Sequence, residues 1–75
     1  YKKLYMWNIN IFSLNGNKYR VNNQITIYNL IDYMVYKQSL IVVEHNHKII
    51  MRTTWKKKKI CNDDKIEIIT IVGGG

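Results

Sequence analysis

The chain has 75 residues, of which 47% are hydrophobic, and it carries a formal net charge of +7. A domain of this size buries only about 60% of the surface that its unfolded chain exposes, which excludes a large enclosed active site. The apolar content and the absence of proline predict a folded domain rather than a disordered one. Twelve basic against five acidic residues are compatible with nucleic acid, acidic lipid or an acidic protein as partner, and the charge alone selects none of them.

Residue usage bears on the cellular setting. Heavy use of Ile, Asn, Lys and Tyr and the lack of Ala are what AT-rich codons encode, which predicts an organelle or an AT-rich bacterium as the source. Cys61 is the only cysteine, so we expect no intrachain disulfide and a reducing compartment. No apolar run approaches the ~20 residues of a membrane-spanning helix, and no signal peptide opens the chain. We therefore expect a soluble intracellular protein of the plastid stroma or the bacterial cytoplasm, with no membrane partner.

The first predicted element is a β-hairpin. Residues alternate between two faces over 9–14 and again over 18–21, and Asn15-Gly16 stands between the two runs. Asn-Gly in this setting is the strongest short-range signal for a tight hairpin turn. The first two strands are therefore expected to be antiparallel, with residues 1–8 as an N-terminal extension or the start of the first strand.

A helix is predicted next, with Thr26 as its N-terminal cap. Asn29 stands where a capping box would have Glu or Gln, so the start of the helix is only moderately marked. About three turns are expected. The apolar residues that recur at the spacing of one buried stripe are Ile27, Leu30, Ile31, Met34 and Val35.

Two further strands are predicted after the helix. Residues 40–43 form a continuous, largely β-branched run, which is typical of a central strand or one covered on both faces. Residues 44–48 are polar and predict a turn, and residues 49–51 then predict a short strand.

The last part of the chain is basic before it becomes apolar. Residues 52–62 predict an irregular basic segment around Trp55. Asn62-Asp63-Asp64 is a turn signal, and residues 65–72 predict the last strand.

The order hairpin, helix, strand, short strand, strand predicts the fold class. A chain this small can bury its helix stripe only by laying it on one face of the sheet. We therefore expect an α+β protein with the β-grasp arrangement of ubiquitin, a mixed sheet of four or five strands with one main helix. The domain is expected over residues 9–72, followed by a flexible glycine tail over residues 73–75. Fold alone does not define function.

From about residue 9 to its end the chain resembles the ThiS family, the ubiquitin-like sulfur carriers of thiamin biosynthesis. The resemblance rests on the segment LIVVEHNHKII with Glu44 and Asn46 in its turn, on Trp55, and on the acidic turn before KIEIITIVGGG. The tight Asn15-Gly16 hairpin and the short span to the tail suit this family better than MoaD, the related molybdopterin carrier.

The resemblance implies a protein co-substrate rather than an enzyme. Gly75 would be adenylated by a ThiF-type partner that uses ATP, and sulfur from a cysteine desulfurase would convert it to a thiocarboxylate. Thiazole synthase of the ThiG type would then accept the sulfur. Gly74 and Gly73 would pass through a narrow channel in the partner, because glycine has no Cβ to clash. No permanently bound cofactor is implied.

Two other functions remain open. The carrier could serve another pathway, such as molybdopterin synthesis or tRNA thiolation. A nucleic-acid-binding domain would instead use Lys56–Lys59 and Arg52, with Trp55 as an aromatic platform, although such a lysine run is more often a solvated surface. The family resemblance makes nucleic acid the less expected partner.

The histidines and the cysteine are the remaining candidates. His45 and His47 lie two residues apart, but a structural zinc site needs four ligands and Cys61 is the only obvious addition, so both are expected as solvated turn residues and no metal is expected. Cys61 could accept a persulfide, yet beside Ile60 it is expected to be a partly buried apolar residue. No catalytic triad, pair of catalytic carboxylates, phosphate-binding loop or dinucleotide motif indicates an independent enzyme.

Overall fold

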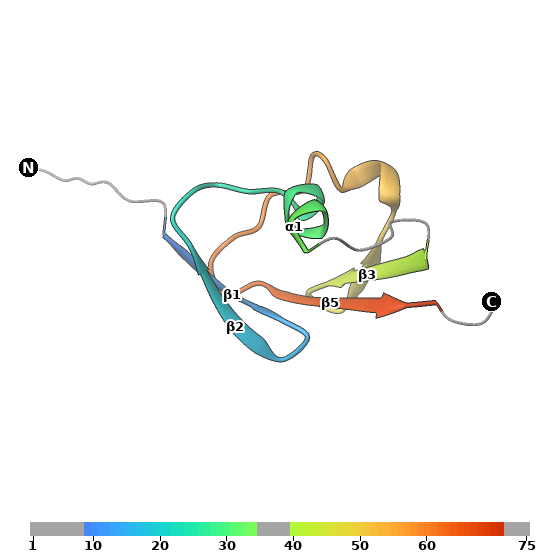
Figure 1. Ribbon diagram of the computed structural model, residues 1–75, viewed down its shortest axis with the longest axis horizontal. Coiled ribbons are helices and arrows are strands. Elements are labelled where there is room, and N and C mark those ends of the chain that lie inside the picture. The colour runs from blue at the N-terminus through green and yellow to red at the C-terminus, as the bar shows by residue number, and fades with distance from the viewer. Residues whose placement is uncertain (1–8, 35–39, 72–75) are drawn as a thin grey trace, which may run out of the picture.

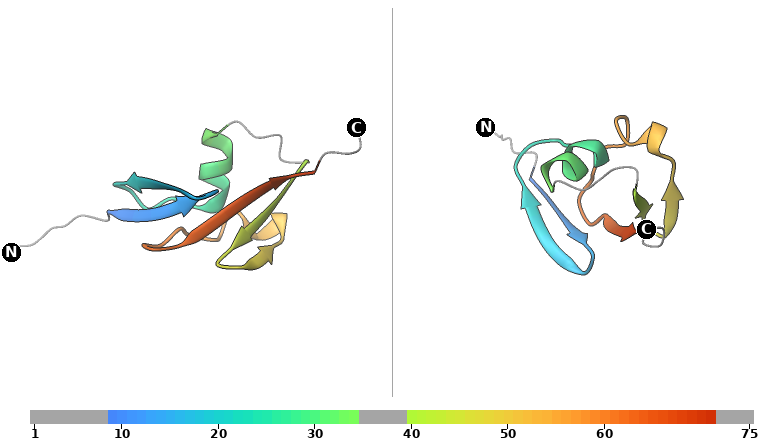
Figure 2. Two further views of the ribbon diagram at one scale, coloured as in Figure 1. Left: turned by 90° about the horizontal axis from the view of Figure 1, so that it is seen from below. Right: turned by 45° about the vertical axis from the view of Figure 1, so that its right-hand side comes forward.

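The computed structural model of the protein describes residues 9–34 and 40–71. Its elements, in chain order, are β1 (Asn10–Leu14), β2 (Asn17–Val21), α1 (Ile27–Tyr33), β3 (Ile41–His45), β4 (Lys48–Ile50), the short 3-10 helix η2 (Arg52–Thr54) and β5 (Lys65–Thr70). The five strands form one sheet in the order β2-β1-β5-β3-β4, and α1 crosses one face of it (Figures 1 and 2). The predicted β-grasp arrangement is therefore confirmed, with five strands.

The two hairpins close through two-residue turns. Asn15 and Gly16 connect β1 to β2 with positive φ values of 50° and 86°, and Asn46 and His47 connect β3 to β4 with φ values of 52° and 72°. Two consecutive positive φ values match the right-handed twist of the flanking strands, which explains why Asn and Gly occur here. The predicted antiparallel pairing of β1 and β2 is confirmed, whereas the polar turn predicted over residues 44–48 is only two residues long.

Helix α1 begins with a complete capping box. The Asn29 N–H donates to Thr26 Oγ1 at 3.1 Å, and the Thr26 N–H donates to Asn29 Oδ1 at 3.0 Å. Asn can therefore fill the position that the capping box usually gives to Glu or Gln. The start of the helix is therefore more strongly capped than its sequence pattern indicated.

The helix is shorter than predicted. It ends at Tyr33, with Met34 as its C-cap, so it has about two turns rather than three. Ile27, Leu30 and Ile31 are buried as the predicted stripe requires. Val35 lies outside the described residues.

Strand β5 is the central strand of the sheet. It pairs parallel with β1 and antiparallel with β3, where Ile41 lies opposite Thr70 and His45 opposite Ile66. The strand ends at Thr70, before the predicted limit, and Val72 lies outside the described residues. β3 lies between β5 and β4, which confirms the central position predicted for residues 40–43.

The hydrophobic core lies between α1 and the face of the sheet that α1 covers. Trp55 is only 2% exposed, so the loop between β4 and β5 also contributes to the core. This loop is held against the start of the helix, because the Ile27 N–H donates to the Lys58 carbonyl at 2.8 Å and the Tyr28 N–H to the Trp55 carbonyl at 3.1 Å. The buried core residues are Phe12, Leu14, Ile27, Leu30, Ile31, Ile41, Val43, Trp55, Ile60, Ile66 and Ile68.

Candidate functional site

The end of β5 is where the sheet leads into the glycine-rich segment. Beyond Thr70, the Ile71 N–H still donates to the Leu40 carbonyl at 2.6 Å, so the backbone is held up to that residue. In Figure 1, β5 ends on the side of the molecule opposite the start of β1. Gly73, Gly74 and Gly75, the predicted carrier segment, lie outside the described residues. A strand hydrogen-bonded on both edges thus fixes the point from which the last residues leave.

The outer face of the sheet, opposite α1, carries an apolar patch beside this strand. Val42 of β3 lies directly opposite Ile69 of β5, and Ile49 of β4 lies opposite Glu44, so their side chains share this face. Ile49 is 68% exposed and Ile69 is 47% exposed. We call Val42, Ile49 and Ile69 the outer patch. Exposed apolar side chains grouped on one face are a common feature of surfaces that bind other proteins.

Two carboxylates interrupt the outer patch. Glu44 and Glu67 lie directly opposite each other on β3 and β5, and like charges in this position destabilise a sheet. Within the described part of the chain, neither carboxylate forms an ion pair. The face therefore offers apolar surface together with negative charge, on a chain whose net charge is positive.

A buried carboxylate connects the β3–β4 turn to the loop before β5. Asp64 is 8% exposed, and its Oδ2 lies 2.8 Å from His45 Nε2 and accepts a 2.7 Å hydrogen bond from the Cys61 N–H. Its Oδ1 accepts from Asn46 Nδ2 at 3.1 Å. Asn46 also accepts from the Lys65 N–H at 2.8 Å through its side-chain oxygen. These contacts fix the first residue of β5.

The same contacts determine the pKa of Asp64. Burial alone would raise it, because burial penalises the charged form. The hydrogen bonds from the Cys61 N–H, His45 and Asn46, with the charge of His45, outweigh burial and lower the pKa of Asp64 below its ordinary value of 3.8. Asp64 is therefore a structural anion that positions the strand leading to the tail.

The structure changes the assignment of His45 and Cys61. His45 lies in β3 and its side chain is 12% exposed, so its prediction as a solvated turn residue was wrong, whereas His47 is an exposed turn residue as predicted. Cys61 is exposed, so its predicted partial burial was wrong: only its backbone faces Asp64. Across residues 9–34 and 40–71, no group of three His, Cys, Asp or Glu residues could hold a metal ion.

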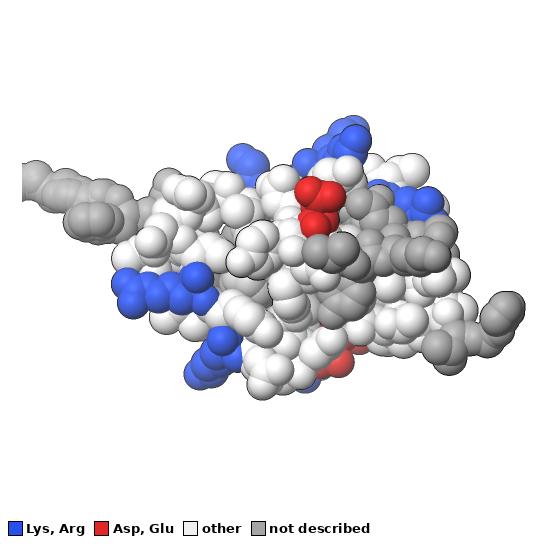
Figure 3. Space-filling view, in the orientation of Figure 1, with Lys and Arg blue, Asp and Glu red and all other residues white. Residues whose placement is uncertain are grey.

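The basic loop forms a solvated surface that does not expose Trp55. Figure 3 shows Lys and Arg side chains along the upper rim of the molecule, over the loop between β4 and β5, with a second group on β2. Trp55 is buried, so it is not available for base stacking. Lys56 Nζ lies 4.9 Å from the centre of the Tyr28 ring. The structure thus excludes Trp55 from the role that the nucleic-acid hypothesis gave it.

The five-stranded mixed sheet, with α1 on one face and β5 as its central strand, defines a ubiquitin-like β-grasp protein. The model of the ThiS family matches residues 9–75. The chain belongs to the ThiS family. None of the helices among the described residues is long and apolar enough to cross a membrane.

The chain is also similar to individual proteins. The chain is 45% identical over 64 residues to the uncharacterized protein ycf40 of Trieres chinensis, covering 85% of this chain and 88% of the relative. It is 32% identical over 68 residues to the protein of the same name from Pyropia yezoensis, covering 91% and 94%. A crystal structure of the thiamine biosynthesis protein ThiS from Geobacter metallireducens has the same fold, with a TM-score of 0.75 at 20% identity, covering 87% of this chain and 99% of that one.

Proposed function

We propose that this protein is a sulfur carrier that bears sulfur as a thiocarboxylate on Gly75. Family membership supports a carrier role, and the observation that carries the proposal is that the family match extends through the glycine tail to residue 75. The fold agrees with it, because the central strand holds the backbone up to Ile71, a few residues before Gly75.

The chemistry requires activation by a partner, because a carboxylate is a poor electrophile. In the proposed cycle a Gly75 carboxylate oxygen attacks the α-phosphorus of ATP on a ThiF-type enzyme, and pyrophosphate leaves. The terminal sulfur of a persulfide, charged by a cysteine desulfurase, then attacks the acyl carbon and AMP leaves. A second thiol cleaves the S–S bond of this acyl disulfide, which forms a new disulfide and leaves the thiocarboxylate. The carrier itself holds no ATP.

The proposed acceptor is a thiazole synthase of the ThiG type. The thiocarboxylate would transfer its sulfur there during thiazole formation. Gly74 and Gly73 would let the tail enter a narrow channel, since neither residue has a Cβ. Delivery to molybdopterin or tRNA is the alternative that leaves the chemistry at Gly75 unchanged.

We place the partner contact on the outer patch and at Ile71. Ile71 is 53% exposed at the end of the held backbone, and the outer patch lies on the same sheet. A partner that covers both would bury apolar surface and guide the tail toward its own catalytic site. A basic side chain of the partner between Glu44 and Glu67 would relieve their repulsion.

We propose the plastid stroma as the location. The support is the residue usage of an AT-rich genome, with many Ile, Asn, Lys and Tyr residues and no Ala. Detection of the protein in isolated plastids, with an antibody or by peptide mass spectrometry, tests this location.

Adenylation can be tested by carrier-dependent exchange of labelled pyrophosphate into ATP by a ThiF-type enzyme from the same organism. We expect exchange with the wild-type chain and none with Gly75→Ala or with Gly75 deleted, both of which should unfold like the wild type in urea. Cys61→Ala is the matched control and should support normal exchange. Wild-type exchange by either Gly75 variant would contradict the proposal.

A further inference from the structure

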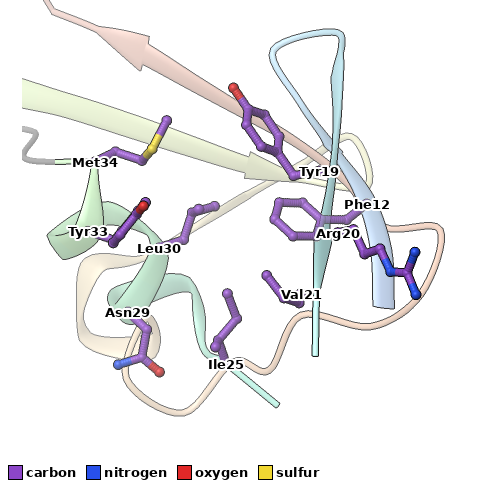
Figure 4. Close-up of a pocket in the computed structure, with 9 residues that line it drawn as sticks. All are labelled: Phe12, Tyr19, Arg20, Val21, Ile25, Asn29, Leu30, Tyr33 and Met34. Carbon is purple, nitrogen blue, oxygen red and sulfur yellow. The ribbon is translucent and has the colours of Figure 1, made fainter. Parts of the chain in front are cut away.

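An apolar groove separates α1 from β2, on the side of the sheet that α1 covers. Its volume is about 480 Å³. Figure 4 shows Tyr19 and Val21 on the strand side facing Leu30 and Met34 on the helix side. The residues that line it are Phe12, Tyr19, Arg20, Val21, Ile25, Asn29, Leu30, Tyr33 and Met34. The groove lies apart from the outer patch, which is on the opposite face.

The strand that borders this groove has a free edge. β2 is the outermost strand of the sheet and pairs only with β1 within the described part of the chain. On the other side of β1, the Ser13 N–H donates to the Asp64 carbonyl, and just after β1 the Asn15 N–H donates to the Ile66 carbonyl of β5, both at 2.9 Å. Backbone groups alternate in direction along a strand, so Phe12 instead bonds to β2, where Tyr19 lies opposite it.

The same alternation determines which groups of β2 are free. Tyr19 is hydrogen-bonded to β1, and so the N–H and C=O groups of Lys18 and Arg20 point to the open edge. An edge of this kind is a template on which another extended chain can pair.

The side chains of β2 divide in the same way. Tyr19 and Val21 face the groove, while strand alternation places the exposed side chains of Lys18 and Arg20 on the other face of β2, although Arg20 is also among the residues that line the groove. Figure 4 shows the Arg20 side chain directed away from the helix. Neither cation has a carboxylate partner among residues 9–34 and 40–71.

We propose that the edge of β2 and the adjoining groove bind an extended peptide of a partner protein in which apolar and acidic residues alternate. The peptide pairs with Lys18 and Arg20 as an added strand. Its apolar side chains enter the groove, and its acidic side chains lie beside the Lys18 and Arg20 side chains. Strand addition of this type takes affinity from backbone hydrogen bonds and specificity from alternate side chains. This site is independent of the sulfur chemistry at Gly75.

The test uses the full chain, labelled with ¹⁵N, and a capped synthetic peptide in which Val and Asp alternate. We expect peptide binding to shift the amide resonances of Lys18, Arg20 and Leu30 and to slow hydrogen exchange at the Lys18 and Arg20 amides. A peptide of the same composition with its residues scrambled should bind more weakly. No binding, or shifts centred on Ile49 and Ile69, would overturn the proposal.

Two variants separate the backbone from the charge contribution. Arg20→Pro removes an N–H at the free edge, a position where strands tolerate proline, and Arg20→Gln removes only the charge. We expect Arg20→Pro to bind roughly threefold to tenfold more weakly than Arg20→Gln, as the loss of one hydrogen bond predicts. Equal affinity of the two folded variants would overturn strand pairing.

A charge exchange tests the site even if the proline variant does not fold. Lys18→Glu with Arg20→Glu should lose affinity for the Val-Asp peptide and gain affinity for one in which Lys replaces Asp. No change in preference would overturn the proposal. Two other occupants of the groove would also overturn the proposal. One is a second copy of the chain, detected as a dimer in sedimentation. The other is residues 1–8, detected as a shift of the Trp7 indole resonance when the peptide binds.

Discussion

At the scale of single residues, Asp64 joins the loop before β5 to a segment that is far away in the sequence. Its carboxylate contacts His45 at the end of β3, Asn46 of the β3–β4 turn and the backbone of Cys61 in the loop before β5. Because the Asp64 carboxylate is hydrogen-bonded, burying its charge costs little free energy of folding. Its neutral form would leave the Cys61 N–H and the side chains of His45 and Asn46 without their charged acceptor. The start of β5 therefore depends on the ionisation of one group.

Stability should fall in acid because of Asp64. Its folded-state pKa lies below the 3.8 of an unperturbed Asp, so its contribution is complete above pH 3.8 and is lost as the pH falls through the folded-state pKa. Urea unfolding between pH 7 and pH 2 should show this loss. Asp64→Asn should lower the free energy of unfolding at pH 7 by about 1–3 kcal/mol and flatten the pH dependence.

The exposed neighbour provides the control for Asp64. Asp63→Asn keeps a side chain that tolerates the positive φ of 69° at this position and should change stability by less than about 0.5 kcal/mol. If Asp63→Asn and Asp64→Asn lower the free energy of unfolding equally, the loss is due to the removal of a negative charge and not to the contacts of Asp64.

Several residue roles could not be read from the sequence. Asp64 was recognised only as part of a turn, and His45 as a polar turn residue, because the contact between them joins positions 19 residues apart. The alternation of residues in the last strand does not indicate this contact, because Asp64 precedes the strand. Asn29, in contrast, stood at the right spacing from Thr26 for a capping box, and the structure shows that its shorter side chain reaches the Thr26 N–H.

At the scale of elements, the helix start has the most direct test. Thr26→Ala removes the hydroxyl that accepts from the Asn29 N–H and should lower the free energy of unfolding by about 1 kcal/mol. Thr53→Ala, in the exposed 3-10 helix without such a cap, is the matched control and should be close to neutral. Urea denaturation of both variants measures the difference, and a neutral Thr26→Ala would show that the cap contributes nothing.

The sequence predicted the elements that have local signals, but it did not predict the residues at which they end. The hairpin followed from Asn15-Gly16, and the helix from its apolar stripe, because both signals lie within a few neighbouring residues. The end of the helix at Tyr33 had no such signal, since Met34 and Val35 continue the apolar pattern. Burial of Trp55 also depends on distant contacts, such as that of its carbonyl with the Tyr28 N–H.

At the scale of the whole molecule, the outer patch and the end of β5 together make up the partner contact that we propose. Ile49→Thr combined with Ile69→Thr keeps β-branched side chains but removes apolar surface from the patch. We expect a KM for the carrier raised roughly tenfold in the adenylation reaction, with kcat unchanged, because binding and not chemistry is affected. Steady-state pyrophosphate exchange measures both constants.

The control for this variant is Ile11→Thr on β1, which is 44% exposed and belongs to a different part of the sheet. It should leave KM within about twofold of the wild-type value, a change of less than 0.5 kcal/mol. An equal effect of Ile11→Thr would place the partner contact elsewhere on the molecule.

The fold could be predicted from periodicity, whereas the site depended on the family resemblance. No residue pattern in the chain by itself indicates sulfur transfer, because the reacting group is a backbone carboxylate and not a side chain. The outer patch required the strand register, since Val42 and Ile69 become neighbours only through the pairing of β3 with β5.

The central claim is that Gly75 carries sulfur, and intact mass spectrometry tests it most directly. The protein is incubated with a ThiF-type enzyme, ATP and a persulfide donor, and a thiol-selective reagent followed by fragmentation locates the modification. We predict a gain equal to the mass difference between sulfur and oxygen, localised to the Gly75 carboxyl group and absent from Gly75→Ala. No gain at Gly75 with an enzyme that loads its own carrier under the same conditions would contradict the account.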